Sequence, residues 1–159
     1  MPPVRLSAAR VLLAVERGHT TLAAELERAR AGLADERDRA LLAELTIGVL
    51  RWRNALDGIL AAYMRRTDDE MAPQVRAVLR LGAYQLRYLD RLPPHAVLHE
   101  SVESIRALAQ SRASGFVNAV LRAMLRDPGK AHLPDAPAAD GTRADQIAFL
   151  TTTLSKRNS

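Results

Sequence analysis

The sequence predicts an all-α protein, and three observations support that prediction. Apolar residues recur every three or four positions over most of the chain, which is the spacing of one helix face. No window shows the strict apolar–polar alternation of a half-buried strand. Aromatic residues make up only 4% of the chain, and β-branched residues are also sparse, whereas strands favour both. Glycine, proline and capping residues divide the chain into about seven helices.

The first three helices are bounded by recognisable capping and breaking residues. One helix is expected over residues 6–16, before a glycine. Thr20 or Thr21 can cap a second helix, and Gly32 ends it. Asp35 caps a third helix, whose first turn is acidic, as the helix dipole favours.

The apolar face of the third helix includes Leu45, Gly48 and Trp52. Trp52 is the only tryptophan, and nucleobase stacking is one conceivable role for it. Its place on the apolar stripe favours a core role instead. Asn54, with Asp57 three residues later, is interpreted as a cap that restarts the chain as a fourth helix at an angle.

Residues 73–90 form the helix around which the others are expected to pack. On a helical wheel its apolar residues cover about half of the circumference, and Pro73 suits its first turn. Gly82 falls near the middle of that arc, where it lets another helix approach closely. Four arginines lie nearly opposite, within about 60° of one another: Arg76, Arg80, Arg87 and Arg91. From spacing alone this stripe is interpreted as a solvated face.

Two further helices, over residues 95–110 and 115–126, complete a domain expected to span residues 1–127. Asn118 lies at the edge of the last apolar stripe. It is interpreted as a structural polar anchor between helices, because a buried amide needs hydrogen-bond partners.

The pattern changes after this domain. Residues 128–141 are rich in proline, glycine and alanine, which is typical of a linker. Residues 142–159 are expected to form a short helix and a tail. That helix is too short to be stable alone and too apolar to be left bare, so it needs a surface to bind. Its apolar edge consists of Ile147, Leu150 and Leu154.

Composition narrows the classes of function. The chain of 159 residues has no cysteine, which excludes disulfides, thiolate metal sites and cysteine nucleophiles within it. Of its four histidines, only His95 and His99 could share a helix face, and no third ligand is evident, so no metal site is predicted. No apolar run reaches the length of a membrane span, and the first residues lack a secretory signal. A soluble, cytoplasmic protein is expected.

The charge favours a nucleic-acid partner. The net charge is +5, and of the 23 basic residues only Lys130 and Lys156 are lysine. Arginine's planar fork suits phosphate better than lysine does. An alanine- and arginine-rich composition also arises from a GC-rich genome, so the charge alone does not establish RNA binding.

No catalytic constellation is found. The chain lacks a dinucleotide-binding glycine motif, a Walker loop and a nucleophile elbow. The only acidic cluster, Asp68, Asp69 and Glu70, is interpreted as a solvated loop. We therefore predict no catalytic residues and no cofactor within this chain.

Three blocks of the sequence resemble the NusB-like domain: DERDRALLAELTIGVLRWRNALD (35–57), LRLGAYQLRYLDRLPPHAVLHESVE (79–103) and GFVNAVLRAMLR (115–126). The resemblance runs from about residue 5 to residue 126 and implies an all-α bundle of about seven helices in two packed sub-bundles. This domain occurs alone as the transcription antitermination factor NusB. It also forms the N-terminal part of the RsmB (Sun/Fmu) type of 16S ribosomal RNA cytosine-5 methyltransferase.

Within the family the chain is more similar to the methyltransferase branch. RDRALLAEL and GVLRWRNALD are typical of that branch, and RADQIAFLTTTLS resembles the segment that leads towards its catalytic part. In that branch an S-adenosylmethionine-dependent domain would follow. The catalytic cysteines of the family have no counterpart here, so this chain is expected to be non-catalytic by itself.

Some residues depart from the family pattern. His99 stands where the family commonly has asparagine, and Ser104 where it has leucine. The first helix carries Arg5 and Arg10, whereas antitermination factors have a denser basic run that binds boxA RNA. The first two departures leave the helix intact, and the sparser basic run weakens a direct carry-over of antitermination activity to this chain.

The resemblance and the arginine excess together imply an RNA-binding domain that docks ribosomal RNA or its nascent transcript. The candidate RNA contacts are Arg5, Arg10, Arg76, Arg80, Arg87 and Arg122. The candidate structural core contains Leu45, Gly48, Trp52, Leu81, Gly82, Tyr84, Phe116 and Asn118. A small-subunit ribosomal protein (NusE) or a C-terminal methyltransferase domain is the expected protein partner, and no membrane is expected. The alternative is a stand-alone antitermination factor that binds nascent ribosomal RNA together with a ribosomal protein.

Overall fold

The computed structural model describes residues 3–65 and 71–131, and within these ranges all regular structure is helical. The described part contains seven α-helices and two 3-10 turns, which confirms the predicted fold class. The elements are α1 (Val4–Glu16), α2 (Leu22–Ala31), α3 (Glu36–Arg51), α4 (Arg53–Ala61), α5 (Pro73–Tyr88), α6 (Pro94–Ala107), η2 (Ser111–Ala113), α7 (Ser114–Arg126) and η3 (Pro128–Lys130).

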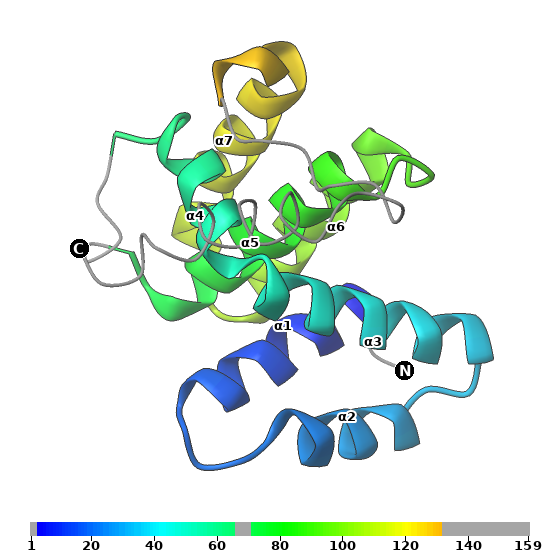
Figure 1. Ribbon diagram of the computed structural model, residues 1–159. Helices are drawn as coiled ribbons and strands as arrows, with labels where there is room; N and C mark the ends of the chain where they lie inside the picture. The colour runs from blue at the N-terminus through cyan, green and yellow to red at the C-terminus, as the bar shows by residue number, and fades with distance from the viewer. Residues whose placement is uncertain (1–2, 66–70, 132–159) are drawn as a thin grey trace, which may run out of the picture.

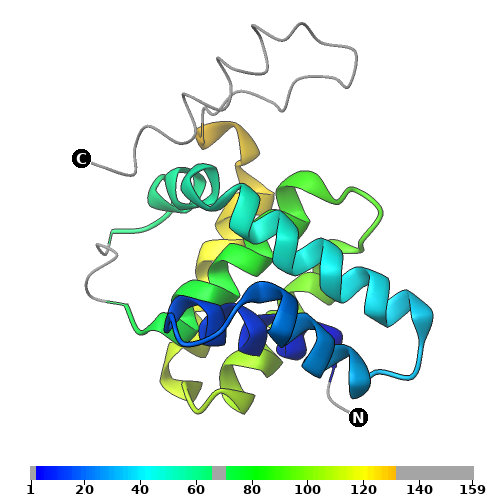
Figure 2. The same ribbon diagram turned by 60° about the horizontal axis from the view of Figure 1, so that its bottom comes forward.

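The helices form two sub-bundles around α5. Helices α1, α2 and α3 pack on one another, and α4, α6 and α7 gather on the other side (Figures 1 and 2). Helix α5 contacts α1, α3, α4, α6 and α7, so it joins the two groups. Its broad apolar arc explains this position, because a helix surrounded by neighbours must be apolar over much of its circumference.

Several helix ends follow the sequence signals. The Thr21 hydroxyl accepts a hydrogen bond from the Ala24 amide at 3.1 Å, and the Asp35 carboxylate accepts one from the Arg37 amide at 2.8 Å. These side chains satisfy amides that have no partner within the helix. Pro73 is the first residue of α5, where its missing N–H costs nothing.

The predicted cap at Asn54 is wrong. Asn54 lies inside α4, and the break between α3 and α4 falls at Trp52, which has φ −103° and ψ 18° and no side-chain cap. The Trp52 amide still donates to the Gly48 carbonyl at 3.0 Å, and the Trp52 carbonyl accepts from the Leu56 amide at 2.8 Å. Trp52 holds the cap position, two residues before Asn54, so α4 begins without the predicted asparagine cap.

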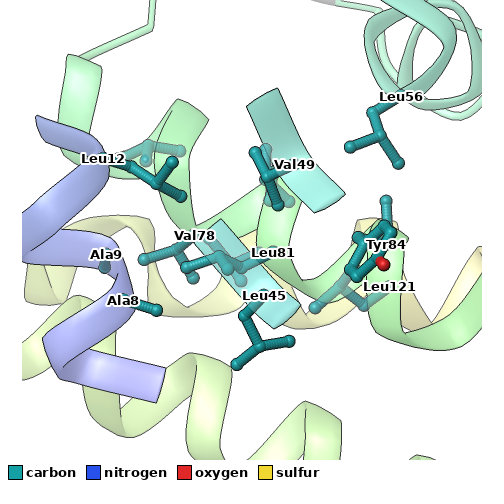
Figure 3. Close-up of a cluster of buried hydrophobic side chains, with 14 of the residues drawn as sticks. Ala8, Ala9, Leu12, Leu45, Val49, Leu56, Val78, Leu81, Tyr84 and Leu121 are labelled. Atoms are coloured by element: carbon teal, nitrogen blue, oxygen red, sulfur yellow. The ribbon is translucent and has the colours of Figure 1, made fainter. Parts of the chain in front are cut away.

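The core lies where α1, α3 and α5 meet and extends to α4 and α7 (Figure 3). Leu45, Leu81 and Tyr84 are buried in it. A Cβ atom on Gly48 would overlap the Tyr84 ring, so only glycine allows that ring to pack against α3. At Gly82 the close neighbour is the Leu121 side chain, 2.8 Å from where a Cβ would lie, and not another helix backbone.

Three of the predicted core residues lie at its edge. Trp52 and Phe116 are half-buried and pack against the core, and Trp52 stacks on Tyr88 with ring centroids 6.0 Å apart. Asn118 is also half-buried, and it lines a surface groove rather than the core. Most of the predicted linker and the short helix expected from residue 142 lie outside the described residues.

Candidate nucleic-acid interface

Arg80, one of the predicted RNA contacts, is buried. Its Nε and Nη2 atoms donate to the two carboxylate oxygens of Asp57 on α4, at 2.7 and 2.9 Å. The stripe is therefore not a solvated face at this position, because a carboxylate from another helix compensates the buried charge. The Arg80 guanidinium joins α5 to α4 and is not available to a phosphate.

Arg5 also makes contacts within the protein. It is half-buried on α1, where its Nε donates to the Gln85 side chain at 2.5 Å and its guanidinium pairs with Glu100. Gln85 is itself buried and donates to the Leu81 carbonyl at 2.9 Å. Arg5 thus links α1, in one sub-bundle, to α6 in the other and to α5 between them.

The other four predicted contacts are divided between two environments. Arg76 and Arg87 are half-buried on α5, and the Arg87 guanidinium lies over the Tyr88 ring, 5.4 Å from its centroid. Arg10 on α1 and Arg122 on α7 are exposed. The structure does not gather the six arginines into one site.

A groove between α6 and α7 offers a more concentrated surface. It has a volume of about 1060 Å³, and the short connection through η2 joins the two helices that form it. Its walls combine cationic, polar and apolar side chains. They are Pro94, His95, Leu98, His99, Val102, Glu103, Arg106, Ser114, Gly115, Asn118, Arg122, Leu125 and Arg126.

The described residues of the groove are net cationic. Glu103, the single carboxylate among them, pairs with Arg106 one turn away on α6 at 3.0 Å. Arg122 and Arg126 are exposed and lie one helical turn apart on α7, so their side chains share a face. Such a pair suits an anionic ligand, because arginine presents several N–H donors in a planar fork.

Sequence reasoning identified Arg122 but missed Arg106 and Arg126 in this groove. The four-residue spacing of Arg122 and Arg126, and of His95 and His99, was the available signal. Each spacing predicts a shared helix face, but neither shows that the two faces line one groove. Within the described residues no cluster of three potential metal ligands occurs. No helix there is long and apolar enough to span a membrane.

Two tyrosines outside the groove have perturbed titration. Burial raises the pKa of Tyr84, and the charge of Glu44 raises it further, while Arg51 and Arg91 oppose the change. Burial also raises the pKa of Tyr63. The Tyr63 hydroxyl donates to the Asp127 carbonyl at 2.6 Å, which holds the end of α7 against the turn that follows α4.

Comparison with known proteins identifies the fold and its relatives. The family model described as the NusB family matches residues 2–126. A crystal structure of the antitermination factors NusB and NusE in complex with dsRNA is similar, with a TM-score of 0.70. The similarity covers 78% of this chain and 94% of that one, at 21% sequence identity. At that level of identity it shows a shared fold.

Curated relatives with higher identity are ribosomal RNA small subunit methyltransferases B. The protein from Xanthomonas campestris pv. campestris is 42% identical over 132 residues, and that from Pseudomonas putida is 39% identical over 123. The matches cover 83% and 77% of this chain, but only 30% and 28% of the relatives. The chain therefore spans less than a third of the length of these relatives.

Proposed function

The chain belongs to the NusB family, and from that premise we propose that it is an RNA-binding domain directed to ribosomal RNA. In this proposal it is non-catalytic by itself and acts in the cytoplasm as the substrate-docking part of a ribosomal RNA cytosine-5 methyltransferase. The similarity to methyltransferases, confined to less than a third of their length, supports this role. It also favours this role over a stand-alone antitermination factor that pairs with a ribosomal protein.

The observation that carries the proposal is the cationic groove between α6 and α7. Arg122 and Arg126 lie one turn apart, and Glu103, the only carboxylate among the described groove residues, is already paired with Arg106. Successive phosphates of an RNA strand can accept hydrogen bonds from such a pair. Asn118 on the same helix adds an amide that can contact sugar or base edges.

Arg10 is a second exposed contact in this proposal, while Arg5 and Arg80 act through the fold. Arg5 holds the sub-bundles together and Arg80 joins α4 to α5. Replacing either is expected to lower stability before it changes any direct contact with RNA.

The test is the salt dependence of binding to a fragment of small-subunit ribosomal RNA, measured by fluorescence anisotropy. Each phosphate contact adds about 0.7 to 0.9 to the slope of log affinity against log salt concentration. The R122Q/R126Q variant should therefore bind more weakly at low salt and lose about 1.5 from that slope.

The matched control is R17Q/R37Q, which removes two exposed arginines, one at the end of α1 and one on α3, that do not line the groove. It changes the net charge by the same amount and should leave the slope nearly unchanged. Equal effects of the two double variants would contradict a specific interface at the groove. Wild-type affinity that does not fall as salt rises would contradict RNA binding through phosphates altogether.

A further inference from the structure

Phosphate contacts do not account for the whole lining of the groove between α6 and α7. The imidazoles of His95 and His99 line it from α6, and both side chains are exposed. Leu125 lines it from α7 and is 41% exposed. Among the described residues Ile47, on α3, is the other large apolar side chain with comparable exposure. Leu125 offers no hydrogen bond to a phosphate, so the groove suits a ligand that carries both a charged part and an apolar part.

The rings and the exposed leucine lie at the same end of the groove. The connection through η2 is short, and packed helices with a short connection run antiparallel. The start of α6, with His95 and His99, therefore lies beside the end of α7, with Leu125 and Arg126. The two histidines are one turn apart and share a face of α6. Flat rings on one helix thus face an apolar side chain and a cation on the other.

The opposite end of the groove attracts phosphate less. Glu103, in the second half of α6, pairs with Arg106 at 3.0 Å, and both line the groove. This pair is neutral as a whole, whereas Arg122 and Arg126 carry two charges with no carboxylate of the groove beside them. The charged part of a ligand is therefore directed towards the end that carries the imidazoles and the leucine.

Asn118 lies on α7 between the two ends and is half-buried. Its amide provides both hydrogen-bond donors and an acceptor, which can match the edge of a nucleobase. Asn118 precedes Arg122 by one turn, which is about 6 Å along the helix. A phosphate on the arginines and a base edge at Asn118 can therefore belong to the same short stretch of an RNA strand.

We propose that the groove between α6 and α7 holds an unpaired nucleotide of single-stranded RNA. Arg122 and Arg126 bind its phosphates. The base lies between His99 and Leu125 and turns its edge towards Asn118. Unpaired bases stack on histidine and other aromatic rings and offer their edges for hydrogen bonds. The groove volume of about 1060 Å³ is sufficient, since clefts that enclose small ligands measure about 300 to 1000 Å³. This site rests on the proposed function and specifies the form of RNA that it accepts.

A groove that bound phosphates alone would prefer a duplex. A nucleic-acid duplex carries roughly twice the charge of a single strand per unit length, so it presents more phosphates to the arginines. The bases of an RNA duplex face inward, and its wide minor groove is shallow, so they cannot enter a concave protein groove. A preference for single-stranded RNA therefore separates a base site from attraction to phosphate.

The test compares three probes on the full chain by fluorescence anisotropy. They are a strand of small-subunit ribosomal RNA that does not pair with itself, the same strand annealed to its complement, and a ribose–phosphate strand of equal length without bases. The single strand should bind more tightly than either other probe. Its advantage over the strand without bases should be at least about fivefold, because stacking of one base changes affinity about 5- to 150-fold.

Histidine variants assign this advantage to α6. At about pH 8, where histidine is ordinarily uncharged, H99A should weaken binding of the single strand at least about fivefold. H99F keeps a flat ring and should restore most of the affinity. Neither variant should change the slope of log affinity against log salt concentration, because no phosphate contact is removed. The matched control is H19A, which removes an exposed imidazole between α1 and α2, outside the groove, and should leave the affinity nearly unchanged.

A second pair of variants assigns the apolar contact to α7. L125A should weaken binding of the single strand at least about threefold, because it removes apolar carbons that the base covers. Its matched control is I47A, since Ile47 is 40% exposed but lies on α3 and does not line the groove. I47A should leave the affinity nearly unchanged.

Three results would overturn the base site. One is a duplex that binds as tightly as the single strand, and another is a strand without bases that does so. The third is a loss with H99A and L125A no larger than with H19A and I47A. If R122Q/R126Q still lowers the salt slope in these cases, RNA binding through phosphates stands and the base site alone fails. An unchanged salt slope in R122Q/R126Q contradicts the proposed phosphate interface instead, so the two proposals fail by different results.

Discussion

Replacing Arg80 by methionine separates a structural role from an RNA contact. Sequence spacing placed Arg80 on a basic stripe, but the structure pairs it with Asp57 through two hydrogen bonds of 2.7 and 2.9 Å. Methionine keeps most of the apolar stem and removes the guanidinium. The Asp57 carboxylate then stays against α5 without its partner.

The expected loss of stability follows from how deeply the pair is buried. The Arg80 side chain is 8% exposed and the Asp57 side chain 25%. Breaking a fully buried ion pair costs about 3 to 5 kcal/mol. Since Asp57 retains some contact with water, we expect R80M to lower the free energy of unfolding by about 3 kcal/mol. Domains of this size have about 5 to 15 kcal/mol in total, so the variant should still fold.

Urea unfolding followed by the fluorescence of Trp52 measures this loss. The double variant R80M/D57L removes both charges and should recover part of the stability, because no unpaired carboxylate remains. R10M, at an exposed position on α1, serves as the control and should change stability by less than about 0.5 kcal/mol. RNA affinity of the folded R80M chain should equal that of wild type. A stability loss below about 1 kcal/mol combined with weaker RNA binding would refute this reasoning.

Other substitutions test the packing and titration of α3 and α5. G48A should lower the free energy of unfolding by about 1 to 3 kcal/mol, because its Cβ would overlap the Tyr84 ring. A Cβ at Gly115 meets no atom within 4 Å, so G115A should raise the free energy of unfolding by up to about 1 kcal/mol. Urea unfolding measures both changes. Because the pKa of Tyr84 is higher in the folded state than in the unfolded chain, stability should fall as pH rises above about 10. Y84F should reduce that alkaline loss in unfolding curves measured between about pH 8 and about pH 11, and an unchanged pH dependence would contradict the raised pKa.

Local signals in the sequence were sufficient for most of the fold. Helical periodicity, the caps at Thr21 and Asp35 and the proline at the start of α5 each depend on residues within one turn of one another. Such signals act through local hydrogen bonds and side-chain spacing, so they can be recognised without tertiary structure. The error at Asn54 has the same origin: an asparagine with an acidic residue three positions later resembles a cap, but the cap position of α4 falls two residues earlier, at Trp52.

The candidate site was less accessible from the sequence, since it depends on which helix faces meet. Arg80 and Arg122 are both arginines on the outer side of an amphipathic helix, and nothing local distinguishes them. Arg80 is buried because Asp57, 23 residues earlier, lies opposite it on α4. Arg122 is exposed beside a groove because α6 packs along α7 and places Arg106, not an unpaired carboxylate, on the same side. The burial of Arg80 and the exposure of Arg122 both depend on tertiary packing.

The arginine excess therefore divides into groups with different consequences for binding. Arginines that pair with carboxylates, as Arg5, Arg80 and Arg106 do, contribute little net charge to an approaching RNA, because the attraction of each is offset within about 4 Å. Salt screens distant exposed charges, so a long-range excess spread over the surface has little effect at physiological ionic strength. In the proposed interface a local pair such as Arg122 and Arg126 would remain effective, because it would act within contact distance of a phosphate. The net charge of +5 indicates a nucleic-acid partner only through those arginines whose charge no acidic neighbour offsets.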